Sequence, residues 1–174
     1  MHVSKRKGIA LLVVAVFAGS AFSASALAHF NIPIMHHNRV HEVLKTDVIG
    51  SVPGDGKIHG VAAGGAPWKI AFGRAHVFSN GVVIVAVKGL LFTGTGTAND
   101  NTVGPVQKVD AALYCGADTN TMAAFTTKSV PLNAQGNALI VDKVMLPKRC
   151  MTPELLINPN SAPGVFIAGS GFGM

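Results

Sequence analysis

Cysteine, aromatic and charged residues are all scarce in this chain. Its 174 residues include two cysteines, one tryptophan and one tyrosine, and only 13% of the residues are charged. Neither cysteine belongs to a C-x-x-C pair, which argues against a redox or structural zinc site built on thiolates. The eight acidic residues are dispersed, so their spacing identifies no carboxylate pair of the kind that glycoside hydrolysis requires.

Basic residues form no extended run outside the N-terminus. Three of the 14 Lys and Arg residues are Lys5, Arg6 and Lys7, and beyond them 11 basic residues face 8 acidic ones. Only Lys148 and Arg149 are adjacent in that remainder. A phosphate backbone needs a concentrated basic stripe, so the sequence predicts no nucleic-acid partner.

Familiar catalytic and nucleotide-binding motifs are also missing. Gly169-Ser170-Gly171 is not followed by a helix, so it lacks the strand-to-helix turn of a G-x-S-x-G nucleophile. Gly94-Thr95-Gly96 lacks the third glycine and the βαβ context of a dinucleotide-binding loop. We therefore expect a protein without enzymatic activity. The alternative is an enzyme whose site is assembled from distant strands.

The N-terminus has the three parts of a secretory signal peptide. A positive start is followed by an uncharged, mostly apolar run from Gly8 and by small residues that end in Ala26-Leu27-Ala28. The alternative is an uncleaved membrane anchor, because about 20 uncharged residues can span a bilayer. The small residues favour residues 1–28 as a signal peptide cut after Ala28, with a cut after Ala26 as the alternative. We expect a secreted or periplasmic protein with no stable membrane insertion after cleavage.

The exported chain would contain both cysteines, Cys115 and Cys150. In an oxidising compartment a single pair of thiols has one intramolecular pairing, so we predict a Cys115–Cys150 disulfide. Two free thiols or two metal ligands are the alternatives.

From residue 57 to residue 174 the pattern is one of strands and turns. Residues 69–78 alternate with period two, and 82–87 form a β-branched run short enough for a strand covered on both faces. Asn80-Gly81 between them is a strong hairpin signal. Further strands are expected at 106–115, 122–132, 137–146, 154–158 and 165–168. Strands about every ten residues without an amphipathic helix predict an all-β antiparallel β-sandwich, immunoglobulin-like or related.

Residues 29–56 lack clear periodicity and are expected to be irregular, with a turn or two of helix allowed at 38–44. Four histidines, His29, His36, His37 and His41, are concentrated there. On a helix, His37 and His41 would share one face and could hold a metal ion. The cluster is therefore a candidate copper or zinc site. Its alternative is a flexible segment whose histidines only titrate near neutral pH.

Cleavage after Ala28 would also place a free amino group beside the imidazole of His29. This arrangement resembles the N-terminal histidine brace of exported copper proteins such as lytic polysaccharide monooxygenases and periplasmic copper chaperones. The resemblance implies a second, distant histidine, for which His59 and His76 are the candidates. A paired strand histidine is the simpler interpretation of His76, and Trp68 is expected to close the end of the core. Asp118-Thr119-Asn120 is oxygen-rich but does not match a calcium loop, so it is interpreted as a turn.

A broader resemblance spans about residues 60–171. Its features are Gly64-Gly65-Ala66-Pro67-Trp68, the hairpin, Cys115, Leu146-Pro147-Lys148-Arg149-Cys150, Leu156-Ile157-Asn158-Pro159 and Ile167-Ala168-Gly169-Ser170-Gly171. This arrangement resembles small exported bacterial all-β proteins of unknown function that carry one disulfide. The resemblance implies a fold and a location but no activity. We therefore expect a binding or structural role toward a protein or another component of the cell envelope or extracellular space.

Overall fold

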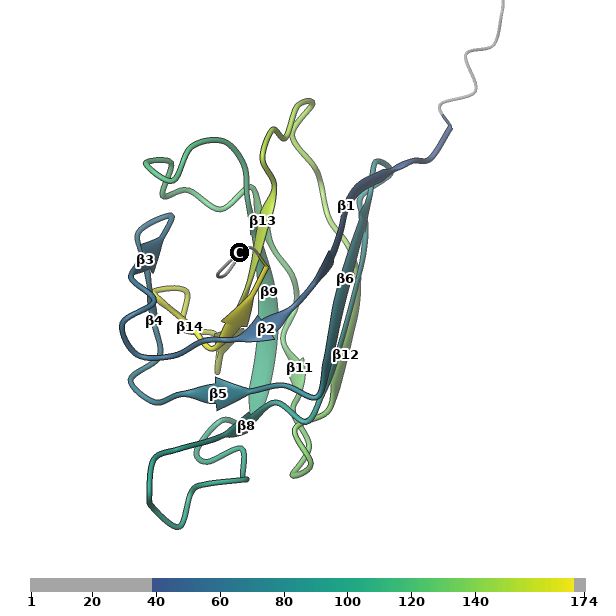
Figure 1. Cartoon of the computed structure of the whole chain (residues 1–174). Helices are drawn as coiled ribbons and strands as arrows, with labels where there is room; N and C mark the ends of the chain where they lie inside the picture. The colour runs from purple at the N-terminus through teal and green to yellow at the C-terminus, as the bar shows by residue number, and fades with distance from the viewer. Residues whose placement is uncertain (1–38, 171–174) are drawn as a thin grey trace, which may run out of the picture. The chain divides into compact units, whose positions relative to one another are not determined.

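The computed structural model describes residues 39–170 of the chain, and the regular elements in this range are all β-strands (Figure 1). The strands are β1 (Glu42–Asp47), β2 (Ile49–Gly50), β3 (Lys57–Ile58), β4 (Val61–Ala63), β5 (Trp68–Lys69), β6 (Phe72–Phe78), β7 (Val82–Lys88), β8 (Leu91–Phe92), β9 (Lys108–Tyr114), β10 (Phe125–Thr126), β11 (Val130–Pro131), β12 (Ala138–Lys143), β13 (Glu154–Pro159), β14 (Val165–Phe166) and β15 (Ala168–Gly169). The predicted all-β class is confirmed. No helix in the described range could cross a membrane.

Two larger sheets and two small ones make up this fold. The four-stranded sheet has the order β1-β6-β7-β12, and every neighbouring pair in it is antiparallel. The six-stranded sheet has the order β10-β9-β13-β15-β2, with β11 also paired to β9. A three-stranded sheet of β14, β4 and β3 contains a parallel pair, β14–β4, and β5 pairs with β8.

The predicted hairpin is confirmed as β6 and β7, joined by Ser79, Asn80 and Gly81. Only Gly81 has a positive φ in this turn, +85°, and its N–H donates to the carbonyl of Phe78. The side chain of Asn80 accepts a hydrogen bond from the backbone of Val82. The sequence signal was therefore correct, and the glycine supplies the left-handed residue that the turn requires.

The main core takes side chains from both larger sheets. In β7, Val83, Val85 and Val87 are buried while the residues between them are half-buried. They belong to the same apolar cluster as Leu113 of β9 and Leu155 of β13. The expectation that residues 82–87 are covered on both faces is wrong, because one face of β7 retains partial exposure.

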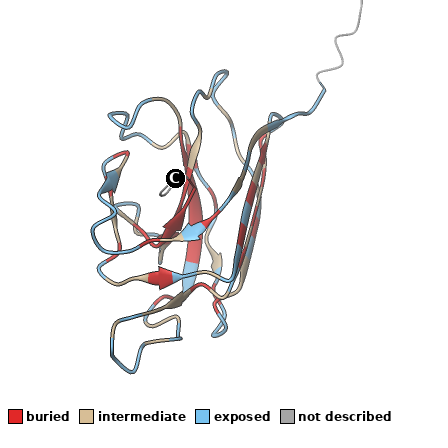
Figure 2. Ribbon diagram, viewed as in Figure 1, coloured by how far each residue is buried: buried red, intermediate tan, exposed pale blue. Residues whose placement is uncertain are grey.

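The strands that are covered on both faces are β9 and β13. Apart from residues at their ends they are buried throughout, as Figure 2 shows in red. Their second face packs into a smaller apolar cluster in which Leu156 and Phe166 are fully buried. These two strands therefore form the centre of the described structure.

The segment before residue 57 is more regular than expected. Residues 42–47 form β1 and pair with β6, so the expected helical turn at 38–44 and the irregular character of 29–56 are wrong for this stretch. β2 adds to the six-stranded sheet, so the β-domain begins before residue 57.

The strand expected at 122–132 is reduced to the short strands β10 and β11. Between them the side chain of Thr127 accepts a hydrogen bond from the backbone N–H of Ala111, in place of a strand ladder bond. The backbone N–H of Lys128 donates to the carboxylate of Asp142. Side chains compete here with the backbone pairing that alternation alone would predict.

Cys115 and Cys150 form a disulfide, as predicted, with Cα atoms 5.0 Å apart. The bond joins the end of β9 to the segment that precedes β13. Close to it, the N–H of Gly116 donates to the carbonyl of Met151 over 2.7 Å.

Candidate functional site

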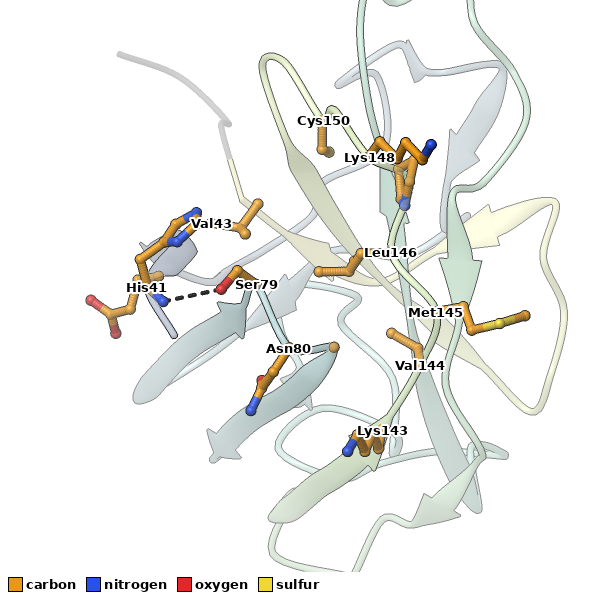
Figure 3. A pocket seen from close by; sticks show the side chains of 13 residues that line it. His41, Val43, Ser79, Asn80, Lys143, Val144, Met145, Leu146, Lys148 and Cys150 are labelled. Atoms are coloured by element: carbon orange, nitrogen blue, oxygen red, sulfur yellow. Dashed lines mark hydrogen bonds between the residues drawn. The ribbon is translucent and has the colours of Figure 1, made fainter. Parts of the chain in front are cut away.

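A groove of about 790 Å³ lies in the described part of the chain (Figure 3). One side is formed by the start of β1 and by the turn between β6 and β7. The other side is the segment 143–148 with Cys150. The N–H of His41 donates to the hydroxyl of Ser79 across the first side, as the dashed line in Figure 3 marks.

Residues 145–149 follow β12 outside any regular strand, with a bend at Lys148, and have unused backbone groups. Val144 still donates to the carbonyl of Gly81, but the backbone C=O groups of 145–149 bond to no other backbone group among the described residues. The same holds for their N–H groups, except that Pro147 has none. Burial alternates along the segment: Val144 and Leu146 are half-buried against the core, whereas Met145 is 92% exposed. In Figure 3 the side chain of Leu146 points toward the groove and that of Met145 points to the other side of the segment.

The rim of the groove carries more positive than negative charge. Lys143 and Lys148 lie on the segment side, and Glu42 lies on the opposite side. The Nδ1 atom of His76 is 2.7 Å from the carboxylate of Glu42, so that carboxylate is already engaged. The two lysines have no ion-pair partner in the described range, and the groove therefore offers a cationic edge above an apolar floor.

Of the predicted metal ligands, only His41 lies within the described residues. It is exposed immediately before β1, and its Nδ1 atom is 3.4 Å from the carbonyl of Arg39. His29, His36 and His37 lie outside the described residues. The strand interpretation of His76 is confirmed by its position in β6 and its pairing with Glu42.

Two other residues singled out in the sequence have structural positions. Trp68 is 4% exposed, and its ring centroid lies 4.1 Å from the ring centroid of Phe92, which confirms Trp68 as a core residue. Ser170 is buried, and its hydroxyl accepts a hydrogen bond from the backbone of Leu155. That hydroxyl is therefore committed to backbone pairing.

Two aspartates outside the groove have shifted pKa values of opposite sign. Burial raises the pKa of Asp110, and a hydrogen bond from Ser129 opposes the shift. Backbone N–H groups of Lys128 and Lys143 donate to Asp142 and lower its pKa. Asp142 thereby links β12, which leads into the groove segment, to the loop between β10 and β11.

A second cluster brings together side chains that the sequence did not connect. His59, Asp118 and Glu154 form the one group of three or more possible metal ligands in the described range, and their ligand atoms all lie within 4.8 Å of one another. Sequence reasoning considered His59 only as a second brace histidine and interpreted Asp118 as a turn residue. Nothing in local spacing connects them, because the three residues come from separate parts of the chain.

No family model matches the chain, and neither a curated protein nor a solved structure shows significant similarity to it.

Proposed function

We propose that this chain is an exported binding protein without enzymatic activity, and that it captures an extended peptide segment of a partner protein in the groove beside residues 143–148. The observation that carries the proposal is the unpaired backbone of 145–149 next to that groove. Exposed backbone groups of an extended segment can add a further strand by main-chain hydrogen bonds. The pockets between alternate side chains then give specificity.

The chemistry of the groove indicates which segment would fit. Val144 and Leu146 offer an apolar floor, and Lys143 and Lys148 supply positive charge at its rim. A partner segment that alternates apolar with acidic residues complements both features. The volume of about 790 Å³ lies in the ordinary range for ligand pockets.

Export and fold belong to the same proposal. The three-part N-terminus is typical of a secretory signal, and a disulfide is common in oxidising compartments. We propose a β-sandwich in which the four-stranded and six-stranded sheets face each other, which is supported by the apolar cluster that they share. N-terminal sequencing of secreted protein tests the export, with His29 as the expected first residue.

The binding proposal is tested by selecting extended peptides from a displayed library against the exported protein. We expect the selected peptides to combine apolar residues with Asp or Glu. The double variant Lys143→Glu/Lys148→Glu should weaken their binding at least tenfold. The matched control is Lys57→Glu/Lys88→Glu, which makes the same charge change at two exposed lysines outside the groove and should leave affinity unchanged.

Nuclear magnetic resonance adds a test that does not depend on charge. The amide signals of residues 143–146, 148 and 149 should shift when a selected peptide is added, and those of β15 should not; Pro147 has no amide proton. If the library yields no binder, or if the double variant and the control bind equally, the groove is not the binding site.

A further inference from the structure

The histidine at residue 59 occupies a tight turn in a backbone conformation unusual for its type. It joins β3 to β4 together with Gly60, and the φ angles of the two residues are +50° and +78°. Its side chain is nevertheless 1% exposed, and its backbone N–H donates to the carboxylate of Asp118. The turn therefore directs an imidazole inward, where turn residues usually face solvent.

The ring of His59 is fixed in one orientation. Its Nδ1 atom is 2.7 Å from the backbone carbonyl of Asn120, and because a carbonyl only accepts, Nδ1 carries the proton and donates. Its plane stacks on Tyr114 with ring centroids 4.9 Å apart and an angle of 11°. This leaves Nε2 directed at the carboxylate of Glu154, at 3.0 Å.

These features match the arrangement of a metal-binding histidine. Such residues donate one ring N–H to a carbonyl or carboxylate, which orients the other nitrogen toward the metal. Two ligands of a tetrahedral zinc ion, each about 2.0–2.1 Å from the metal, lie about 3.3 Å apart. The spacing between Nε2 and the Glu154 oxygen is close to that value.

The two carboxylates complete the ligand set and keep it accessible. Asp118 is exposed and Glu154 is 32% exposed, so an ion can enter from solvent without unfolding the protein. The Cys115–Cys150 disulfide connects the two segments that carry these residues. The bond therefore holds the carboxylates near each other before any ion arrives.

We propose that His59, Asp118 and Glu154 form a divalent-metal site of zinc type, with Nε2 and two carboxylate oxygens as protein ligands and water in the remaining position. The site uses no residue of the N-terminal histidine cluster and does not depend on the peptide-binding proposal.

The test is a calorimetric Zn²⁺ titration of the exported chain. The background carries His29→Ala, His36→Ala, His37→Ala and His41→Ala, so that the N-terminal histidines cannot contribute. We expect one ion per chain with a dissociation constant in the micromolar range or tighter.

Three conservative variants in that background decide the assignment. Glu154→Gln and Asp118→Asn should each weaken Zn²⁺ binding at least tenfold, and both retain an oxygen that can accept the existing hydrogen bonds. Glu42→Gln is the matched control, because it alters the other described histidine–carboxylate pair, His76–Glu42. It should leave the affinity unchanged. Thermal unfolding without zinc should confirm that all three variants are folded.

Loss of binding in Glu154→Gln and Asp118→Asn alone supports the site. Absence of stoichiometric binding in the parent, or equal effects of Glu154→Gln and Glu42→Gln, overturns it and leaves an ordinary histidine–carboxylate ion pair.

Discussion

Breaking the Cys115–Cys150 disulfide should cost the protein about 3.8 kcal/mol of stability. The cysteines are 35 residues apart. On the chain-entropy estimate, closing a loop of that length lowers the conformational entropy of the unfolded chain by an amount equivalent to about 3.8 kcal/mol at 25 °C. The magnitude corresponds to roughly a 600-fold change in the folding equilibrium, since about 1.36 kcal/mol is a factor of ten. It is a large share of the stability of an ordinary domain.

Denaturant unfolding of three samples measures the effect. They are the oxidised protein, the same protein reduced with a phosphine, and the variant Cys115→Ala/Cys150→Ala. The reduced protein keeps both sulfur atoms, so its difference from the oxidised protein isolates the cross-link. The alanine variant adds the loss of two half-buried side chains that pack against the core.

Amide hydrogen exchange should show the effect of reducing the disulfide on the residues next to it. The amide of Gly116, which donates to Met151, should exchange faster after reduction, while amides at the centre of β7 should change only with global stability. A difference below about 1 kcal/mol between oxidised and reduced protein would refute the chain-entropy reasoning for this loop.

Two further predictions concern a turn and a pair of carboxyl groups. Gly81→Ala should destabilise the protein by at least 2 kcal/mol, because a Cβ there would meet the carbonyl oxygen of Val144 at 2.0 Å in addition to the cost of a positive φ. Gly56→Ala, with a similar φ of +83° and open space, should lose only about 1 kcal/mol, and equal losses in urea unfolding would contradict the steric argument. Asp110→Asn should stabilise the protein more at pH 7 than at pH 3. The raised pKa of Asp110 means that its charged form destabilises the folded state, and asparagine removes this charge at pH 7 but changes little at pH 3, where the carboxyl is already protonated. Asp142→Asn should destabilise the protein at pH 7 and have little effect on stability near pH 2. The lowered pKa of Asp142 means that its charged form stabilises the folded state, and this stabilisation is lost once the carboxylate is protonated. Parallel pH profiles for the two variants would disprove these assignments.

Local sequence signals were reliable where neighbouring residues decide the structure. Asn80-Gly81 between two apolar runs defined the β6–β7 hairpin, because a turn of this kind depends on a residue that tolerates positive φ. Turn residues between apolar segments also located much of β12 and β13. The same signals failed at 122–132, where hydrogen bonds from distant residues interrupt the strand.

The β1 strand was missed for a related reason. Its burial pattern is weak, since residues 42–47 lie at the edge of the four-stranded sheet and none of them is fully buried. An edge strand needs only partial alternation, so its pairing with β6 is evident only in three dimensions.

The sequence by itself determined the all-β class, the hairpin and the disulfide pairing, because each follows from short-range patterning or from the presence of only two cysteines. Only the tertiary structure decided which side chains meet. His59 and Asp118 are 59 residues apart in the chain, and Glu154 reaches them through the pairing of β13 with β9. Such contacts depend on sheet register and on how turns are placed, and these are set by the packing of the whole core.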